Sequence, residues 1–344
     1  MKKILSLICF LIILFGNLSA DNSSLNFRFT TSYESNILHL SENDIDQFLA
    51  DTYSAYSGQY KLKSVDDLIY SFRVNLNYKN YLVGGHTQID KITFGYDKYQ
   101  KNGFNDFKFI SLQIDQYLNK YFKCFAKYYY YPNIYINQYK SELESSDEYR
   151  ELAYSKDKYV SGGKLSIPNL FRFEYSFEFA QSYHNQYFTY YNADIFNNSF
   201  SVEFFPLKNF KIKAKYSYKF SLTDIFVQAG QEVMDASYNS DIYFLSLNFP
   251  LNMLGLRTRF IYSWEFEDKY YQSNLPIEID EFHKNRNDQI IDHNIILKYS
   301  VFENITLRGL YEFKQRKTYS PKEIVKREKN YTAYSWGLGI SLNF

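Results

Sequence analysis

The last residues of the chain alternate strictly between two kinds of side chain up to the C-terminus. The large apolar positions are Tyr334, Trp336, Leu338, Ile340, Leu342 and Phe344, and the positions between them are Ser335, Gly337, Gly339, Ser341 and Asn343. Because successive side chains of a β-strand point to opposite faces, this segment has one apolar face and one small, polar face. It contains no charge and no proline, so we predict an uninterrupted strand that ends with the chain.

This terminal segment resembles the closing strand of Gram-negative outer-membrane β-barrels, which commonly ends in an aromatic residue after alternating apolar positions. The resemblance is to the porin-like superfamily and not to a specific family within it. It implies that the barrel-assembly machinery reads the segment from Tyr334 to Phe344, and that outer-membrane lipid and lipopolysaccharide surround the folded protein. It does not imply a particular function.

The N-terminus has the features of an export signal. Lys2 and Lys3 precede an apolar run from Ile4 to Phe15 that is interrupted by Ser6, and the segment ending at Ala20 is an acceptable cleavage site. Such a run is too short to span a bilayer. We therefore predict a cleaved signal peptide over 1–20 and one β-barrel domain over 21–344, located in the bacterial outer membrane.

The composition agrees with a barrel and disfavours several other classes. Aromatic residues make up 21% of the chain, mostly Tyr (37) and Phe (32), which favours strands and an aromatic belt at a lipid boundary. The mean hydropathy of −0.44 fits a barrel, because only half of each strand faces lipid. Removal of two signal-peptide lysines from 39 basic residues leaves 37 against 38 acidic ones, which gives no support to nucleic-acid binding. Cys124 remains as one thiol on an apolar strand face.

The terminal pattern recurs along the chain in segments long enough for a tilted membrane crossing. Short turns such as Pro168-Asn169 alternate with long polar stretches, which is the outer-membrane arrangement of periplasmic turns and extracellular loops. We predict about 14 antiparallel up-and-down strands, with 12 or 16 as alternatives. The ranges are 25–34, 67–79, 81–96, 105–117, 121–131, 156–167, 170–182, 193–205, 209–221, 240–249, 254–267, 289–299, 304–315 and 332–344.

Two segments depart from the regular alternation of the predicted strands. The third strand is irregular, because Val83, Thr87 and Ile89 share one parity whereas the apolar residues that follow take the other, so a bulge is expected. In the first long loop, Ser41 and Asp44 resemble a helix capping box, and the following apolar residues fall on one helical face. We expect a short helix near the barrel opening or, as an alternative, a loop with one helical turn.

Charged residues at inward positions are the candidates for function, because they would line a channel. The basic members are Lys211, Lys213, Lys215 and Lys219 on one strand with Arg257, Arg259 and Arg308 on later strands, and the acidic members are Glu174, Glu178, Glu203 and Glu265. A basic wall beside an acidic wall would select solutes by charge. Alternatively, these charges pair across the lumen and only stabilise it.

These patterns predict an outer-membrane channel that passes small polar solutes by diffusion, with anionic or zwitterionic ones favoured. The alternatives are a surface-loop adhesin, receptor or structural barrel with a blocked lumen, and a barrel hydrolase. The histidines are scattered and no serine motif accompanies them; His86, with Asp90 beyond it, is the one candidate for a catalytic pair. No motif for a phosphate, zinc or calcium site is present, so we expect no enzyme activity, cofactor or metal. The sequence does not determine the oligomeric state.

Overall fold

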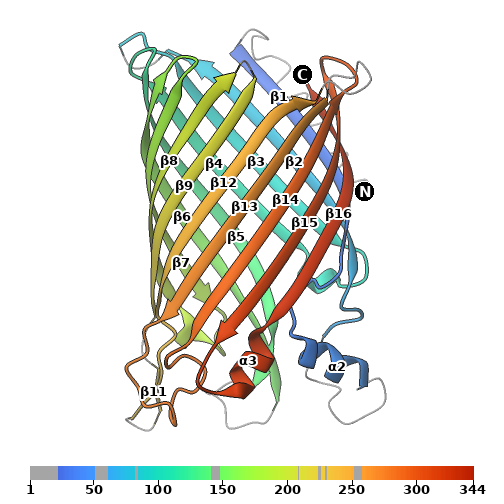
Figure 1. Ribbon diagram of the computed structural model, residues 1–344, viewed down its shortest axis with the longest axis vertical. Coiled ribbons are helices and arrows are strands. Elements are labelled where there is room, and N and C mark those ends of the chain that lie inside the picture. Colours follow the sequence, from blue (N-terminus) through green and yellow to red (C-terminus); the bar gives the residue numbers. More distant parts are fainter. Residues whose placement is uncertain are drawn as a thin grey trace.

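The protein is a closed antiparallel barrel of 14 strands in the part of the chain that the structure describes (Figure 1). The computed structural model describes residues 22–50, 61–81, 84–140, 148–207, 209–223, 226–228, 231–251 and 258–344. The barrel strands are β1 (Ser23–Glu34), β2 (Asp67–Asn80), β3 (Gln88–Tyr99), β4 (Phe107–Tyr117), β5 (Phe122–Lys140), β6 (Tyr149–Ile167), β7 (Phe171–His184), β8 (Ala193–Leu207), β9 (Phe210–Thr223), β12 (Tyr238–Leu251), β13 (Thr258–Tyr271), β14 (Asn287–Ser300), β15 (Ile305–Tyr319) and β16 (Tyr331–Asn343).

The last strand closes the barrel against the first. β1 and β16 pair antiparallel from Asn26↔Asn343 to Glu34↔Ser335. Beyond the strand end, Phe344 still exchanges two backbone hydrogen bonds with Leu25, at 2.8 and 2.9 Å. The predicted fold class is confirmed, and closure leaves no unpaired edge strand in the described part of the barrel wall.

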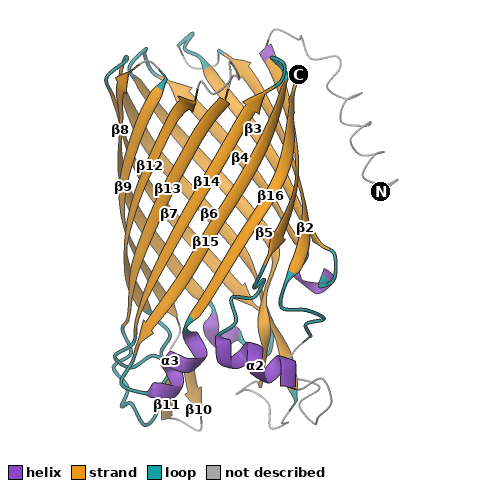
Figure 2. Ribbon diagram, turned by 45° about the vertical axis from the view of Figure 1, so that its right-hand side comes forward, coloured by secondary structure: helices purple, strands orange, loops and turns teal. Residues whose placement is uncertain are grey.

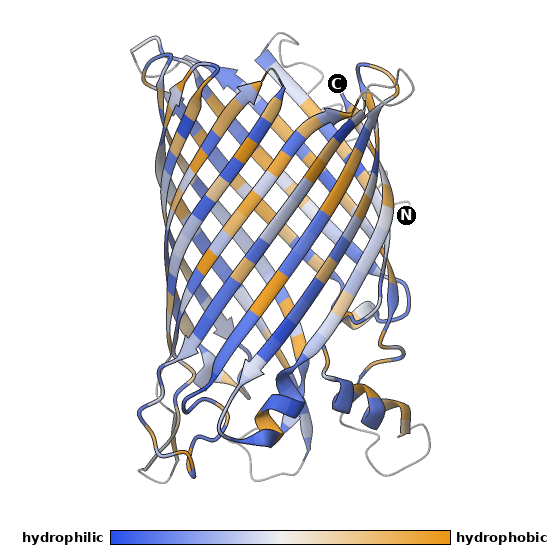
Figure 3. Cartoon of the chain, in the orientation of Figure 1, coloured by the Kyte–Doolittle hydropathy of each residue, from blue (hydrophilic) through white to orange (hydrophobic). Residues whose placement is uncertain are grey.

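Hydrophobic and hydrophilic residues alternate along the strands (Figure 3), and this alternation gives the wall two different faces. On β16 the outward Leu338 is 70% exposed and Phe344 is 68% exposed, whereas the inward Ser341 is buried. Every strand repeats this arrangement, because its register pairs apolar residues with apolar residues on the outer face. Most charged positions of the strands consequently lie on the inner face, with exceptions such as Asp241 and Lys317 near the long-loop end. Within the described residues, no helix is long and apolar enough to cross a bilayer.

The two ends of the barrel differ. At one end, which we call the short-turn end, brief connections join the strands, and the C-terminus lies there (Figure 1). The opposite end, the long-loop end, carries α2 (Glu42–Ala50), α3 (Glu323–Lys329) and a separate two-stranded sheet of β10 (Phe226–Gln228) and β11 (Gln231–Met234), as Figure 2 shows. Short 3₁₀ turns, η3 (Gly103–Asn105) and η4 (Thr189–Tyr191), lie in two further loops.

The helix expected in the first loop is confirmed. The backbone N–H of Asp44 donates to Ser41 Oγ at 3.0 Å, and the N–H of Ser41 donates to an Asp44 carboxylate oxygen at 3.3 Å, which is a reciprocal capping box. The apolar face of α2 packs through Ile45 and Phe48 against a buried cluster that includes Leu40. The sequence did not indicate α3 or the β10–β11 hairpin.

Some boundaries predicted from the sequence were wrong. β3 begins at Gln88, because the chain turns through Gly84 and Gly85, whose φ angles are +57° and +72°. β3 pairs with both neighbouring strands without a register shift, so the expected bulge is absent and Ile89 is an apolar residue on the inner face. β5 extends beyond its predicted limit to Lys140, and β6 begins earlier than predicted, at Tyr149. This hairpin therefore projects beyond the neighbouring strands at the long-loop end.

Candidate functional site

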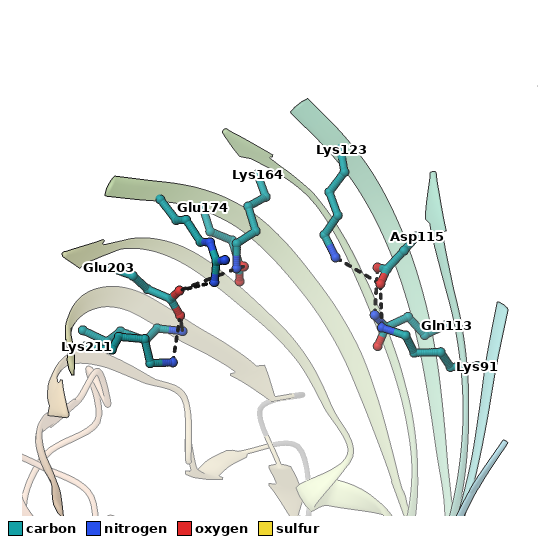
Figure 4. A network of polar contacts seen from close by, with 10 residues as sticks. Lys91, Gln113, Asp115, Lys123, Lys164, Glu174, Glu203 and Lys211 are labelled. Carbon is teal, nitrogen blue, oxygen red and sulfur yellow. Dashed lines mark hydrogen bonds and ion pairs between the residues drawn. The ribbon is translucent and has the colours of Figure 1, made fainter. Parts of the chain in front are cut away.

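The four lysines of β9 that were predicted to line the lumen lie on the inner face, whereas Tyr216 and Tyr218 are exposed on the outer face. These lysines are Lys211, Lys213, Lys215 and Lys219. Two of these lysines lie close to a carboxylate. Lys213 is the direct cross-strand partner of Glu203 on β8, and Lys211 also reaches that carboxylate. Figure 4 shows Glu203 between Lys211 on one side and Lys164 with Glu174 on the other. The predicted acidic and basic residues are therefore interleaved and do not form two separate walls.

Glu203 is the centre of the first charged cluster. Its carboxylate lies 3.4 Å from Lys211 Nζ, 3.5 Å from Arg172 Nη1 and 4.0 Å from both Lys164 and Lys213. The Glu203 side chain is only 9% exposed. Four cations around one nearly buried carboxylate leave this cluster with a net positive charge, reduced by Glu174, which binds Lys164 at 3.3 Å.

The remaining predicted residues on these strands are also paired or screened. Lys219 Nζ lies 2.5 Å from Glu267, which also accepts a hydrogen bond from Ser240. Glu178 binds Lys158 at 2.7 Å. The ammonium of Lys215 lies over the Phe244 ring, and Phe244 is the cross-strand neighbour of Glu265. Arg257 lies outside the described residues.

A second cluster, which the sequence analysis did not single out, is centred on Asp115 of β4. Its carboxylate binds Lys91 at 2.6 Å and Lys123 at 3.0 Å, and it accepts a hydrogen bond from Gln113 (Figure 4). Asp115 is 1% exposed. The three strands β3, β4 and β5 are thus joined at their short-turn ends by one buried carboxylate.

A different arrangement occupies the wall from β13 to β2. Arg259, Lys298 and Arg308 are successive cross-strand partners on β13, β14 and β15, and Arg28 of β1 faces Arg73 of β2 in the same way. The charges that act most strongly on Lys298 are all cationic, namely those of Arg308, Arg28, Arg259 and Lys211. We call Arg28, Arg259, Lys298 and Arg308 the cationic arc.

No carboxylate within the described part of the chain forms an ion pair with any member of the cationic arc. Arg259 donates a hydrogen bond to the carbonyl of Asn209 at 3.1 Å, and Arg73, which faces Arg28, binds Asp97 at 2.7 Å. The Nε atoms of Arg28 and Arg308 are buried without a hydrogen-bond partner. Such groups are uncommon in folded proteins and require an explanation.

The arc is energetically unfavourable for the barrel by itself. Directly opposed cross-strand residues have Cβ atoms about 4.5–5.5 Å apart, and like charges at such positions destabilise a sheet. Two cations about 6 Å apart repel by about 0.7 kcal/mol in water and about 3 kcal/mol at an effective dielectric constant of 20. A wall that only had to be stable would place carboxylates here, as the Glu203 and Asp115 clusters do.

Arg259 and Arg308 were predicted from the sequence as lumen residues, whereas Arg28 and Lys298 were not. Arg28 stands at an inward position of the first alternating segment, so its parity was a usable signal. Lys298 was harder to find, because it follows a run of isoleucines in β14 that masks the alternation. The adjacency of these residues depends on the strand register, which the sequence does not state.

The histidines do not form a shared site. His86 lies in the turn before β3 and not on a strand, so the suggested strand face shared with Asp90 is wrong. His293 pairs with Phe313 on the outer face, where its Nδ1 lies 2.9 Å from the Tyr262 hydroxyl. His283 in the β13–β14 loop binds Asp280 at 2.7 Å. In the ranges that the structure describes, no group of His, Cys, Asp and Glu is arranged to hold a metal ion.

Comparison with known proteins identifies the fold. No protein-family model and no curated protein sequence matches the chain. Among solved structures, the outer membrane channel DcaP of Acinetobacter baumannii matches with a TM-score of 0.50 and 11% identity, over 95% of this chain and 99% of that one.

More distant matches are an anion-selective porin from Comamonas acidovorans (TM-score 0.45, 9% identity, 94% and 98% coverage) and OprD of Pseudomonas aeruginosa (TM-score 0.40, 7% identity, 94% and 95% coverage). At such identities the comparisons establish architecture alone. The protein therefore shares the closed β-barrel fold of the outer membrane channel DcaP.

Proposed function

We propose that the protein is an outer-membrane channel through which small polar solutes diffuse, with a preference for anionic ones. The observation that carries the preference is the cationic arc, whose members have no carboxylate partner within the described residues. An anion that passes this wall relieves the repulsion among the four cations, whereas a cation increases it.

The arc favours anions over zwitterions. The nearest acidic residue along the inner face of β14 is Asp292, which is six residues from Lys298. Six residues of strand correspond to about 20 Å. A small zwitterion carries its two charges much closer together, so it cannot engage the arc and an acidic group on that strand at the same time. We therefore propose that the net negative charge of the solute is what this wall recognises.

The orientation follows from the outer-membrane pattern, in which short turns face the periplasm and long loops face outward. The short-turn end of this barrel would then be periplasmic, and Arg259, Lys298 and Arg308 lie within three residues of the strand ends there. Solutes entering from outside would pass the long-loop end before they reach the arc.

Reversal potentials in planar lipid bilayers test the proposal. With a potassium chloride gradient across a bilayer that contains the purified protein, we expect steady single-channel currents and a higher permeability for chloride than for potassium. The double variant Arg308→Gln/Lys298→Gln should move the reversal potential toward that of an unselective pore. Equal ion permeabilities in the wild type would refute the anion preference, and the absence of any current would refute the channel.

One observation favours the alternative of a barrel whose loops are its functional part. The long-loop end is well packed: Phe188 and Val325 are fully buried there, and α2 lies beside α3. A rigid outer surface suits an adhesin or a receptor. The same bilayer experiment separates the two functions, because a barrel with a blocked lumen conducts no ions.

A further inference from the structure

We infer that the inner face of β16 forms the floor of a binding site for a small oxyanion with two negative charges, and that Arg28 and Arg308 form its two sides. This inference deepens the proposed function and rests on it for the role of the site in transport. The binding itself does not depend on conduction and is tested separately below.

The floor is made by the small side chains of the terminal strand. Gly339 is the cross-strand partner of Arg308 on one side, and Ser341 is the partner of Arg28 on the other. With glycine and serine at these positions, no bulky side chain stands between the two arginines. Neighbouring strands are about 4.8 Å apart, so β15 and β1 are separated by about 10 Å across β16. Because Gly339 and Ser341 are two residues apart, Arg308 and Arg28 are also offset by about 7 Å along the strands, and their long side chains would have to converge over β16 to hold one phosphate or carboxylate group.

The side chains of Arg28 and Arg308 are half-buried, so their terminal Nη groups are the donors that an ion in the lumen would meet. The Nε groups of Arg28 and Arg308 are buried and have no hydrogen-bond partner in the described structure, and the two arginines act on each other as like charges. A guanidinium group presents its N–H donors in a planar fork that matches the oxygens of a carboxylate or a phosphate. A bound oxyanion would accept hydrogen bonds from the Nη groups of both arginines and reduce their mutual repulsion, whereas chloride, a single atom, cannot match the fork of either guanidinium.

The number of cations indicates the charge of the ligand. Lys298 is directly beside Arg308, and the charges of Arg28 and Arg259 also act on it. One negative charge would leave most of this repulsion in place, whereas two charges on one molecule compensate more of it without the entropy loss of binding a second ion. Small dicarboxylates and inorganic phosphate share this chemistry.

Isothermal titration calorimetry on the detergent-solubilised barrel tests the site without requiring transport. We would titrate inorganic phosphate and succinate, with acetate and sodium chloride as monovalent comparators, under mildly alkaline conditions in which phosphate is a dianion. At least one dianion should bind with about tenfold or greater preference over acetate. Tighter binding of phosphate or of succinate identifies which of the two oxyanion classes the site takes.

The variants are Arg28→Gln and Arg308→Gln, and the matched control is Lys317→Gln, which removes one positive charge from the outer face of the same strand as Arg308. Each arginine variant should weaken dianion binding by about tenfold or more, and the control should not change it. Arg308→Lys keeps the charge but loses the fork, so its affinity should fall between those of the wild type and Arg308→Gln.

Denaturant unfolding provides a readout that a structural role would not produce. Removal of one of several mutually repelling cations should leave the ligand-free barrel as stable as the wild type or more stable, so Arg308→Gln should not lower the urea midpoint. A lower urea midpoint for Arg308→Gln overturns the inference. Equal dianion affinity in the wild type and in the double variant Arg28→Gln/Arg308→Gln also overturns it. Dianion binding by a barrel that conducts no ions would support the site and refute the channel, and conduction without dianion binding would do the reverse.

Discussion

Replacement of Glu203 by Gln tests whether the lumen is stabilised by the interleaved charges that the structure shows. The change removes the negative charge from a carboxylate that four cations share while it keeps the shape of the side chain. Lys211 and Arg172 lie 3.4 and 3.5 Å from the carboxylate. Lys164 and Lys213 each lie 4.0 Å away. The variant leaves these cations without their shared counter-ion.

The expected loss of stability can be bounded from these distances. At an effective dielectric constant of 20, each attraction is about 4–5 kcal/mol in isolation. Repulsion among the four cations and desolvation of the carboxylate offset most of this sum, and removal of one partner from a buried ion pair costs about 3–5 kcal/mol. The Arg172 side chain is 45% exposed, so solvent screens its share. We therefore expect the free energy of unfolding to fall by about 3 kcal/mol.

Urea unfolding of the barrel refolded in lipid vesicles, followed by tryptophan fluorescence and by heat-modifiable gel mobility, measures this loss. The control is Glu323→Gln on α3, whose side chain is 84% exposed and pairs with Lys326 at 2.9 Å. This exposed pair should contribute about 0.5 kcal/mol or less. If Glu203→Gln and the control lower the free energy of unfolding equally, the reasoning from the Glu203 cluster is wrong.

Three further predictions concern the terminal strand and the first loop. A Cβ atom at Gly337 would lie 2.5 Å from a backbone oxygen of β1, so Gly337→Ala should destabilise the barrel by about 1–3 kcal/mol, whereas Gly309→Ala, with no atom within 4 Å, should be neutral in the same urea titration. The Phe344 side chain is exposed and its backbone bonds to β1, so Phe344→Ala should reduce assembly in cells without changing the stability of the purified barrel, and a normal yield of assembled barrel would contradict the assembly role. Burial, followed by the cations of β15, lowers the pKa of His39 to about 4, so the unfolded chain binds the proton first as pH falls. Since 35% of the His39 side chain is exposed, we expect its contribution to be a loss of about 1 kcal/mol between about pH 6.5 and 4, so the wild type should lose about this much more stability over the range than His39→Phe.

The sequence predicted the architecture well because the period-two pattern is imposed by lipid on every strand. The strand count, the closing role of the terminal segment and the capped helix α2 follow from local signals that the structure confirms. The start of β3 was not predictable in the same way, because two glycines with positive φ form a turn where apolar residues imitated a strand.

The pairing of the inner charges depended on information that local patterns do not contain. Lys211 and Glu203 are close in sequence, but the sequence does not show that residues of β6 and β7 reach the same carboxylate. Those contacts depend on the registers of β6–β7, β7–β8 and β8–β9. The same holds for the cationic arc, whose members come from β1, β13, β14 and β15. Parity predicted which face each side chain takes, and register determined which side chains meet there.

The small face of the terminal strand is not explained by barrel closure alone. Gly337 is required by its close approach to the backbone of β1, and the outer apolar residues are required by lipid. At Gly339 an added Cβ would meet the Thr30 hydroxyl at 2.6 Å and the backbone oxygen of Phe29 at 2.8 Å, so close approach to β1 also favours glycine there. A serine or alanine there would narrow the space between Arg308 and Arg28. If Ser341 served barrel closure only, Ser341→Gln would leave dianion binding unchanged. We expect this variant to preserve the stability of the barrel and to weaken dianion binding, because the longer side chain fills the space between the two arginines. Unchanged binding would show that the space has no such role.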